Sequence, residues 1–359
     1  MPAFKQKILE TARGLRSSLS SSESDQDQAR RLQQAERQLE TQRAQISKQK
    51  AQLEKQSQEL KELRAKVSES VHGAEPVGIS PENVIWILGY ARTGSTWLAF
   101  MMEEIEGYTV WREPYVGVLF GRLYYDWVGE KHFETKHFIL GRHYKESWLK
   151  SVRYFVLHEA SVRFPRVADG GYLVIKEPNG SIGAPLLMEA LPESRMILLV
   201  RDPRDVMASR LDSTRKGSWL YERRVEQGGR RTAMFEMEEN NLVESTASAY
   251  LRSVGNSKQA YDAHRGPKVL VRYEDLRSDT LGTMKRIYSS LRVPVGEREL
   301  SEAVKKHSWE NVPEEEKGPG KFHRKGTPGS WREDLAPRHI EMVERITSPL
   351  LKEFYPDER

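Results

Sequence analysis

Residues 83–97 read NVIWILGYARTGSTW, an apolar run that passes into a glycine-containing loop. A short and almost continuously apolar run is typical of a strand buried on both faces of a parallel sheet. Helical periodicity begins at Ser95, immediately after the loop. This order of strand, loop and helix predicts an α/β unit. The amide groups of the loop and of the helix N-terminus would together form an anion site.

The same alternation of short apolar runs and helical periodicity repeats along the chain after this unit. Further strands are predicted at 108–114, 171–178, 195–203 and 267–275. Helices are predicted after Ser95, over 147–164, 184–191 and 239–263, and from Pro203, Thr280 and Pro337. The alternation predicts a P-loop-like α/β fold, an open parallel sheet flanked by helices. Such sheets bind ligands beyond the carboxyl ends of their strands, so the residues that follow the apolar runs are the candidates for a site.

The N-terminal region has a different pattern. No glycine or proline occurs from Leu15 to His72, and six apolar residues recur at intervals of seven. They are Leu32, Leu39, Ile46, Leu53, Leu60 and Val67. The spacing predicts a coiled coil over 25–72 that pairs two copies of the chain weakly, because the second seam is mostly glutamine; a single exposed helix is the alternative.

The remaining segments are expected to be a basic, serine-rich segment over 1–24, a linker over 73–81 and the folded α/β domain over 82–359. No run is apolar enough to cross a bilayer, and the N-terminus lacks the features of a secretory signal. We therefore expect a cytoplasmic protein without membrane contact.

The charge and the cysteine count exclude several classes of function. The net charge is +5, but residues 1–72 hold 14 Lys and Arg against 10 Asp and Glu, which leaves 43 and 42 for the rest. A nearly neutral folded domain gives no reason to expect nucleic acid as a partner. The chain has no cysteine, which excludes thiol nucleophiles, disulfides and cysteine metal sites.

The loop over 89–96 nearly matches the GxxxxGK[ST] pattern of nucleotide triphosphatases. However, Ser95 stands where those enzymes need a lysine, and Arg201 rather than an acid follows the apolar run at 195–200. Arg92 supplies the positive charge. The loop therefore keeps the cradle for a phosphate-like group without the magnesium-dependent machinery, and no metal is expected.

Arg92-Thr93-Gly94-Ser95-Thr96-Trp97 resembles the 5′-phosphosulfate loop of sulfotransferases that use 3′-phosphoadenosine 5′-phosphosulfate (PAPS). Three more segments, in the same order as in that family, are similar to its nucleotide-binding segments. They are RDPRDVMAS (201–209), VRYEDL (271–276) and RKGTPGSW (324–331). The last departs from the family pattern, which has aspartate at the position of Ser330.

The resemblance implies that PAPS is the co-substrate and that these segments bind it. Arg201, Ser209 and the loop at 324–326 would hold the 3′-phosphate, and Trp97 and Tyr273 would contact the adenine. The implied cofactor-binding residues are Arg92, Thr93, Gly94, Ser95, Thr96, Trp97, Arg201, Ser209, Tyr273, Arg324, Lys325 and Gly326.

Sulfuryl transfer to an alcohol needs a base, positive charge on the transferring group, and a cation where the leaving phosphate gains charge. The resemblance implies that Lys176 stabilises the negative charge on the leaving phosphate. Arg92 would supply positive charge to the transferring group. A histidine base two residues after the lysine is typical of the family's small-molecule branch. Pro178 occupies that position and cannot accept a proton.

Glu113 follows the second predicted strand and resembles the glutamate base of the protein-tyrosine and carbohydrate branches. An ion pair of Glu113 with Arg112 or Arg92 is the structural alternative. Glu177 is the rival base, although adjacent strand residues face opposite ways and Glu177 would point away if Lys176 points in.

The acceptor is expected to be a hydroxyl of a sugar, a phenol or a tyrosyl peptide, bound by aromatic and basic residues within 115–165 and 212–245. His132, His137 and His143 are not assigned a role. Two other functions remain open: a nucleotide-dependent phosphotransferase on the same fold, and a coiled-coil interaction protein with an inactive nucleotide-binding domain.

Overall fold

The computed structural model describes residues 25–72, 79–127, 136–226 and 237–357. The chain divides into two compact units, Met1–Glu75 and Pro76–Arg359. In the first unit, helix α2 runs over Asp25–His72 and leaves Leu39, Ile46 and Leu53 48%, 50% and 66% exposed. The predicted helix is present, and its pairing with a second copy stays a prediction. No helix of the described residues has the length and apolarity needed to span a membrane.

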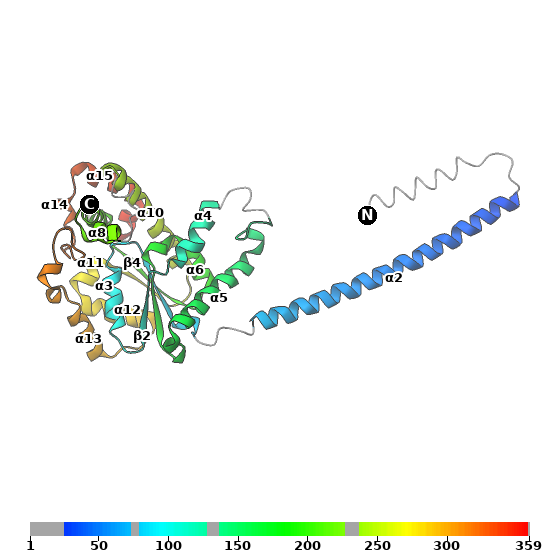
Figure 1. Ribbon diagram of the computed structural model, residues 1–359, viewed down its shortest axis with the longest axis horizontal. Coiled ribbons are helices and arrows are strands. Elements are labelled where there is room, and N and C mark those ends of the chain that lie inside the picture. The colour runs from blue at the N-terminus through cyan, green and yellow to red at the C-terminus, as the bar shows by residue number, and fades with distance from the viewer. Residues whose placement is uncertain (1–24, 73–78, 128–135, 227–236, 358–359) are drawn as a thin grey trace. The chain divides into compact units, whose positions relative to one another are not determined.

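The second unit is built on a five-stranded, entirely parallel sheet with strand order β2-β3-β1-β4-β5 (Figure 1). The strands are β1 (Val84–Gly89), β2 (Tyr108–Arg112), β3 (Tyr172–Lys176), β4 (Arg195–Val200) and β5 (Lys268–Arg272). All five lie within the predicted apolar runs. The predicted α/β class and the open parallel sheet are therefore confirmed.

Successive residues of β1 point into two different cores, as the strand pleat requires. Ile85 and Ile87 belong to one cluster of buried side chains, and Trp86 and Leu88 belong to the other. All four side chains are completely buried. This is why the run at 84–88 is continuously apolar rather than alternating.

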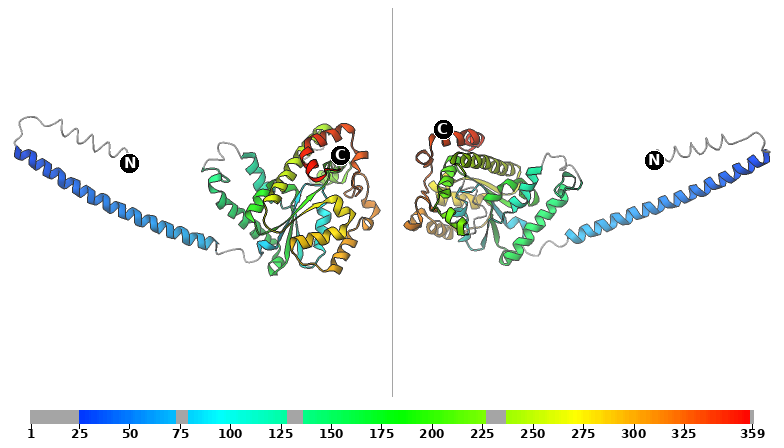
Figure 2. Two further views of the ribbon diagram at one scale, coloured as in Figure 1. Left: turned by 180° about the vertical axis from the view of Figure 1, so that it is seen from behind. Right: turned by 45° about the horizontal axis from the view of Figure 1, so that its top comes forward.

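Helices cover both faces of the sheet, and the seven predicted helical stretches all contain a helix. On one face lie α3 (Ser95–Glu103), α12 (Thr280–Leu291) and α13 (Glu297–Lys306). On the other lie α5 (Lys145–Arg163), α6 (Ala184–Ala190) and α10 (Glu239–Ala263). Helix α15 (Pro337–Phe354) packs along α10 and against α7 (Pro203–Thr214), as the views of Figure 2 show.

Several short elements of the described residues were not predicted, because too few residues carry a readable period. They are the π-helical turn Val118–Arg122, α4 (Leu123–Trp127), α8 (Trp219–Glu226), α11 (Tyr273–Ser278) and α14 (Trp331–Asp334).

Two predicted strands extend into the α-helix that follows. The run at 195–203 includes Pro203, the first residue of α7, whereas β4 ends at Val200. The run at 267–275 was predicted to be a strand throughout, but β5 ends at Arg272 and Tyr273 is the first residue of α11. Glu274 and Asp275 lie in the first turn of this helix, where negative side chains are favoured by the helix dipole. The apolar pattern of the strand hid this change of structure.

Candidate active site

The loop between β1 and α3 turns on two residues in the left-handed region. Arg92 has a φ of 70° and Gly94 a φ of 89°. A Cβ atom on Gly94 would lie 2.6 Å from the Tyr273 ring, so only glycine fits here. Helix α3 begins at the next residue, Ser95, and its first residues line a cavity. The helix N-terminus is thus placed where an anion can bind.

The cavity has a volume of about 350 Å³ and gathers residues from distant parts of the chain. It is lined by all the predicted cofactor-binding residues except Thr93. The predicted residues among those lining it are Arg92, Gly94, Ser95, Thr96, Trp97, Arg201, Ser209, Tyr273, Arg324, Lys325 and Gly326. Thr93 is completely buried and its hydroxyl donates to the Tyr90 carbonyl at 2.8 Å, so its side chain serves the loop itself.

Four arginines line this cavity: Arg92, Arg201, Arg277 and Arg324. Arg201 Nη1 donates to the Arg92 carbonyl at 3.1 Å, and Arg201 Nε is buried without a hydrogen-bond partner among the described residues. Burial and then the neighbouring charges of Arg201, Arg210 and Arg324 lower the pKa of Arg92 to about 10. Buried cations that lie together cost free energy unless an anion neutralises them. The cavity is therefore suited to a polyanion.

Arg92 is held by contacts with α7, with the start of α8 and with the loop that contains Phe322. Its Nε donates to Ser209 Oγ at 3.0 Å, and its guanidinium lies 5.4 Å from the Trp219 ring centroid and 5.3 Å from that of Phe322. A guanidinium over aromatic rings gains cation–π attraction. The structure thus brings Arg92 and Ser209 together. The aromatic contacts were not predicted, because Trp219 and Phe322 lie far from the glycine loop in the sequence.

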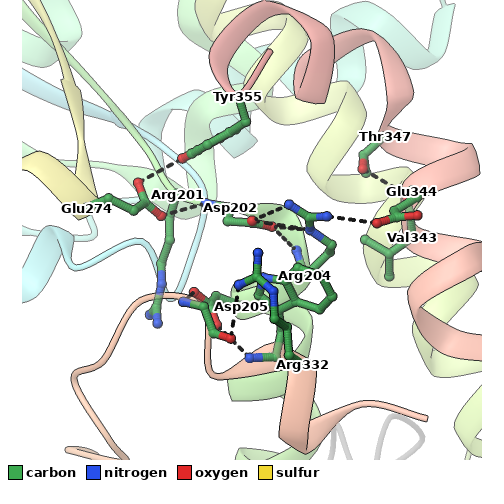
Figure 3. A network of polar contacts seen from close by, with 12 residues as sticks. Arg201, Asp202, Arg204, Asp205, Glu274, Arg332, Val343, Glu344, Thr347 and Tyr355 are labelled. Carbon is green, nitrogen blue, oxygen red and sulfur yellow. Dashed lines mark hydrogen bonds and ion pairs between the residues drawn. The ribbon is translucent and has the colours of Figure 1, made fainter. Parts of the chain in front are cut away.

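Helix α7, which carries Ser209, is fixed at its start by a buried ionic network (Figure 3). Asp202 caps the helix by accepting from the Arg204 amide at 2.8 Å, and its carboxylate pairs with the Arg204 guanidinium at 2.8 Å. Arg204 also pairs with Glu344 of α15 at 2.8 Å. Glu274 accepts from the Asp202 amide at 3.0 Å and from the Tyr355 hydroxyl at 2.9 Å. The start of α7 is therefore held against α11 and α15.

The predicted adenine contacts lie side by side. The Trp97 and Tyr273 rings meet edge to face with centroids 6.3 Å apart, and Arg201 lies 4.2 Å from the Tyr273 centroid. Trp97 Nε1 donates to the His307 carbonyl at 2.7 Å. Both rings are thus fixed in place before any ligand binds, with His307 an unpredicted member of the cavity wall.

The loop at 324–326 closes another side of the cavity. Gly326 has a φ of 63°, and a Cβ atom there would lie 2.7 Å from the Trp309 ring. Arg277 Nε donates to the Gly326 carbonyl at 3.0 Å. Arg277 and Trp309 both line the cavity and were missed. A signal existed for Arg277 alone, since it follows Tyr273 by four residues and thus shares its helix face.

Glu113, which follows β2, and Lys176, the last residue of the adjacent strand β3, form an ion pair. Arg112 and Lys176 are register partners, and the Glu113 amide donates to the Lys176 carbonyl at 2.8 Å. Lys176 Nζ contacts Glu113 Oε1 and lies 3.2 Å from Thr96 Oγ1 of the glycine loop. Lys176 is 4% exposed, whereas the Glu113 side chain is 32% exposed. The carboxylate is thus the member of the pair that solvent or a substrate can reach.

The segment around Glu113 is strained and braced. Glu113 and Tyr115 have φ values of 51° and 60°, a region that costs side-chain-bearing residues of order 1 kcal/mol or more. Asn179 Nδ2 donates to Glu113 Oε2 at 2.8 Å and thereby holds the second oxygen. Asn179 was not predicted, although its position three residues after Lys176 placed it beyond the same strand end.

Glu177, the rival base, is enclosed. It is completely buried, and its carboxylate accepts from the Tyr115 amide at 3.0 Å and the Gly117 amide at 3.2 Å. Burial raises the pKa of Glu177 to about 7. Its contacts are with the backbone that carries Glu113, so it braces the strained segment rather than facing an acceptor. The alternative ion pair of Glu113 with Arg112 is absent, because Arg112 pairs with Glu103.

Several residues of the predicted acceptor region are exposed. His137 and His143 are exposed, and His132 lies outside the described residues. Leu119, Leu123 and Phe155 are 55%, 42% and 39% exposed. Within the described ranges, no three His, Asp or Glu side chains gather as a metal site would require.

Two solved sulfotransferases are among the proteins to which this chain is similar. The mouse sulfotransferase SULT7A1, solved in complex with PAP, is 15% identical, with a TM-score of 0.48 over 77% of this chain and 86% of its own. The sulfotransferase STF9 from Mycobacterium avium is 16% identical, with a TM-score of 0.46 over 81% of each chain. No curated protein sequence gives a significant match.

The match to a family model shows the family to which this chain belongs. The model of the sulfotransferase domain matches residues 82–355, about three quarters of the chain and nearly all of its second unit. This match confirms the family predicted from the four motif segments. The chain is a member of the sulfotransferase domain family.

Proposed function

We propose that this protein transfers the sulfuryl group of PAPS to a hydroxyl group of an acceptor. The observation that carries the proposal is the Lys176–Glu113 pair, which meets the glycine loop through Thr96. A cation and an accessible carboxylate are thereby joined at the edge of a loop suited to a phosphosulfate. These are the groups that sulfuryl transfer needs at its two reacting oxygens.

In the proposed reaction, the acceptor oxygen attacks sulfur in line with the leaving group. A new oxygen–sulfur bond forms, and the bond between sulfur and the bridging oxygen of the 5′-phosphate breaks. Glu113 takes the proton of the acceptor hydroxyl. Lys176 stabilises the negative charge on the leaving phosphate, while Arg92 and the amides of 94–96 bind the phosphosulfate oxygens. Asn179 would keep Glu113 oriented once Lys176 turns to the cofactor.

The nucleotide would occupy the cavity with its 3′-phosphate toward Arg201, Ser209 and the loop at 324–326. The buried Nε of Arg201, which has no partner among the described residues, supports this placement. Trp97 and Tyr273 would enclose the adenine. The product left in the cavity would be 3′-phosphoadenosine 5′-phosphate (PAP).

The acceptor we propose is a sugar, phenol or tyrosyl hydroxyl bound next to Glu113 and Tyr115. Tyr115 is 43% exposed, and Asn179 lies 3.5 Å from its hydroxyl. An aromatic face beside an amide suits each of these acceptor classes.

We further propose that α2 pairs two copies of the chain as a parallel coiled coil. The heptad residues Leu39, Ile46 and Leu53 are exposed on the isolated helix. Pairing would bury this seam, and the weak second seam would keep the dimer labile.

The direct test is turnover of PAPS labelled in the sulfuryl group, in EDTA, with a panel of sugars, phenols and tyrosyl peptides. Transfer of label to at least one acceptor, with release of PAP, is expected. If the label is never transferred and the protein hydrolyses ATP with magnesium instead, the phosphotransferase alternative is correct.

A further inference from the structure

The loop at 324–331 departs from the family pattern at Ser330, and the neighbouring acid Asp334 contacts both cations of this loop. On the basis of the proposed function, we infer that Asp334 is a positioning residue that holds Arg324 and Lys325 for the 3′-phosphate. It would do so in place of the aspartate that the family pattern has at position 330. Asp334 was not among the site residues predicted from the sequence.

Asp334 uses a different oxygen for each cation. Its Oδ2 accepts from Arg324 Nη1, and its Oδ1 accepts from Lys325 Nζ at 2.8 Å. The Arg324 side chain is 8% exposed and that of Asp334 is 21% exposed. Ion pairs so shielded from water are stronger than surface pairs. One carboxylate thus sets the orientation of two neighbouring side chains.

The helix geometry explains how position 334 can replace position 330. The Asp334 amide donates to the Ser330 carbonyl at 3.2 Å, so the two residues are one helical turn apart, with Ser330 just before α14 and Asp334 at its end. Residues four apart lie on the same helix face. Ser330 still contributes its hydroxyl, which accepts from Arg324 Nη2 at 2.9 Å, but it carries no charge.

The end of the loop is anchored independently on α7. Asp205, which is completely buried, accepts from the Gly329 amide at 2.7 Å and the Trp331 amide at 3.0 Å. Figure 3 shows Asp205 beside the segment at 329–332. Asp205 precedes Ser209 by one turn of α7. The loop that carries Asp334 is therefore fixed to the helix that carries another predicted ligand of the 3′-phosphate.

The contacts of Asp334 leave the cations able to bind an anion. Arg324 has five N–H groups, and the bonds to Asp334 and Ser330 use one on each terminal nitrogen. Arg324 and Lys325 both line the cavity. Without Asp334, a nearly buried guanidinium would lose its counter-ion in the ligand-free protein and would turn away from the cavity toward water.

The test is calorimetric titration of Asp334→Asn with PAP and, separately, with adenosine 5′-phosphate, which lacks the 3′-phosphate. We expect PAP affinity to fall by about tenfold or more, the usual effect of losing hydrogen bonds between charged groups. Affinity for adenosine 5′-phosphate should change less than about twofold. General misfolding would not produce this difference, because it would weaken the binding of both nucleotides. Glu333→Gln is the matched control, because the Glu333 side chain is 81% exposed and its carboxylate pairs with Lys325 at 3.4 Å.

The double variant Ser330→Asp/Asp334→Asn returns an acid to the position of the family pattern. It should recover PAP affinity to within about threefold of the unmodified protein, and it tests the inference even if the single variant does not fold. The inference is overturned if Asp334→Asn binds PAP equally well or more tightly, if it loses both nucleotides equally, or if the double variant does not recover. An unmodified protein that binds PAP no better than adenosine 5′-phosphate would instead refute the proposed function, and the inference with it.

Discussion

The cofactor side and the acceptor side of the site are built in different ways. On the cofactor side, the loop after β1, helix α7 and the loop at 324–331 converge on one cavity, and their polar groups hold one another before a ligand arrives. On the acceptor side, Glu113 and Asn179 are held by hydrogen bonds, but Leu119, Leu123 and Phe155 beyond them are exposed and apolar.

This difference shows where chemistry and specificity reside in the molecule. A charged nucleotide needs fixed donors at fixed spacing, which a preorganised pocket supplies. An acceptor with an apolar or aromatic face needs shape and area, which many side chains can supply. Changes on the cofactor side should therefore affect nucleotide binding, and changes at the junction of the two sides should affect turnover alone.

The largest effect is expected from Glu113→Gln, which removes the proposed base. Turnover of PAPS should fall by roughly 10²–10⁴-fold, the usual contribution of a general base. PAP affinity should stay within a few-fold, because Glu113 does not line the cavity. Steady-state kinetics with calorimetry would separate the two quantities. Glu103→Gln is the control, since Glu103 forms a surface pair with Arg112; unchanged turnover in Glu113→Gln would refute the assignment of the base.

The next effect is expected from Arg201→Ala on the cofactor side. Loss of a buried guanidinium that we propose as a ligand of the 3′-phosphate should weaken the binding of PAP and PAPS alike, by roughly tenfold to a hundredfold. Adenosine 5′-phosphate should be affected less. Arg298→Ala is a suitable control, because Arg298 is 91% exposed in a surface pair with Glu302. Equal losses for all three nucleotides would show that Arg201 does not read the 3′-phosphate.

A smaller effect, on stability, is expected from the pH dependence of Glu177. Burial raises the pKa of Glu177 from 4.5 to about 7. The folded protein therefore binds this proton more tightly than the unfolded chain, and its stability falls as the pH rises between these two values. Glu177→Gln cannot ionise, so its melting temperature should gain a few degrees on that of the unmodified protein across this window. If the melting temperatures of the two proteins differ by the same amount at every pH from 4 to 8, the raised pKa is contradicted.

The smallest effect on activity is expected from the helical unit. Ile46→Asp/Leu53→Asp places charge in the heptad seam and should convert the dimer to a monomer in sedimentation experiments. Turnover per chain should change by less than about twofold, since all the proposed catalytic residues lie within 82–359. The paired change Gln42→Asp/Gln49→Asp, at the weaker seam, should dissociate the dimer less. A protein that is monomeric without any substitution would refute the pairing.

The sequence predicts the cofactor side better than the acceptor side, for a physical reason. Backbone cradles and anion ligands require particular residues at fixed spacing, as at Gly94 and Arg201, so they leave readable motifs. Trp309 contacts the same cavity through long-range packing, which no local spacing reports. Arg277 follows Tyr273 by four residues, but this spacing indicates a shared face only if Tyr273 begins a helix. The sequence indicates that Asn179 lies beyond the end of the strand that carries Lys176. Its hydrogen bond to Glu113, however, depends on the pairing of β2 with β3. Tyr273 was placed on a strand because an apolar period does not mark where a strand becomes a helix.

The central claim, that the cavity binds a 3′-phosphorylated adenine nucleotide without a metal, is tested most directly by calorimetric titration of PAP in EDTA. Adenosine 5′-phosphate and ATP, the latter with and without magnesium, are the comparisons. We predict that PAP binds at least about tenfold more tightly than adenosine 5′-phosphate, because Arg201, Ser209 and the loop at 324–326 are the proposed ligands of the extra phosphate. Equal affinity for the two nucleotides, or tighter binding of ATP that requires magnesium, would contradict the claim.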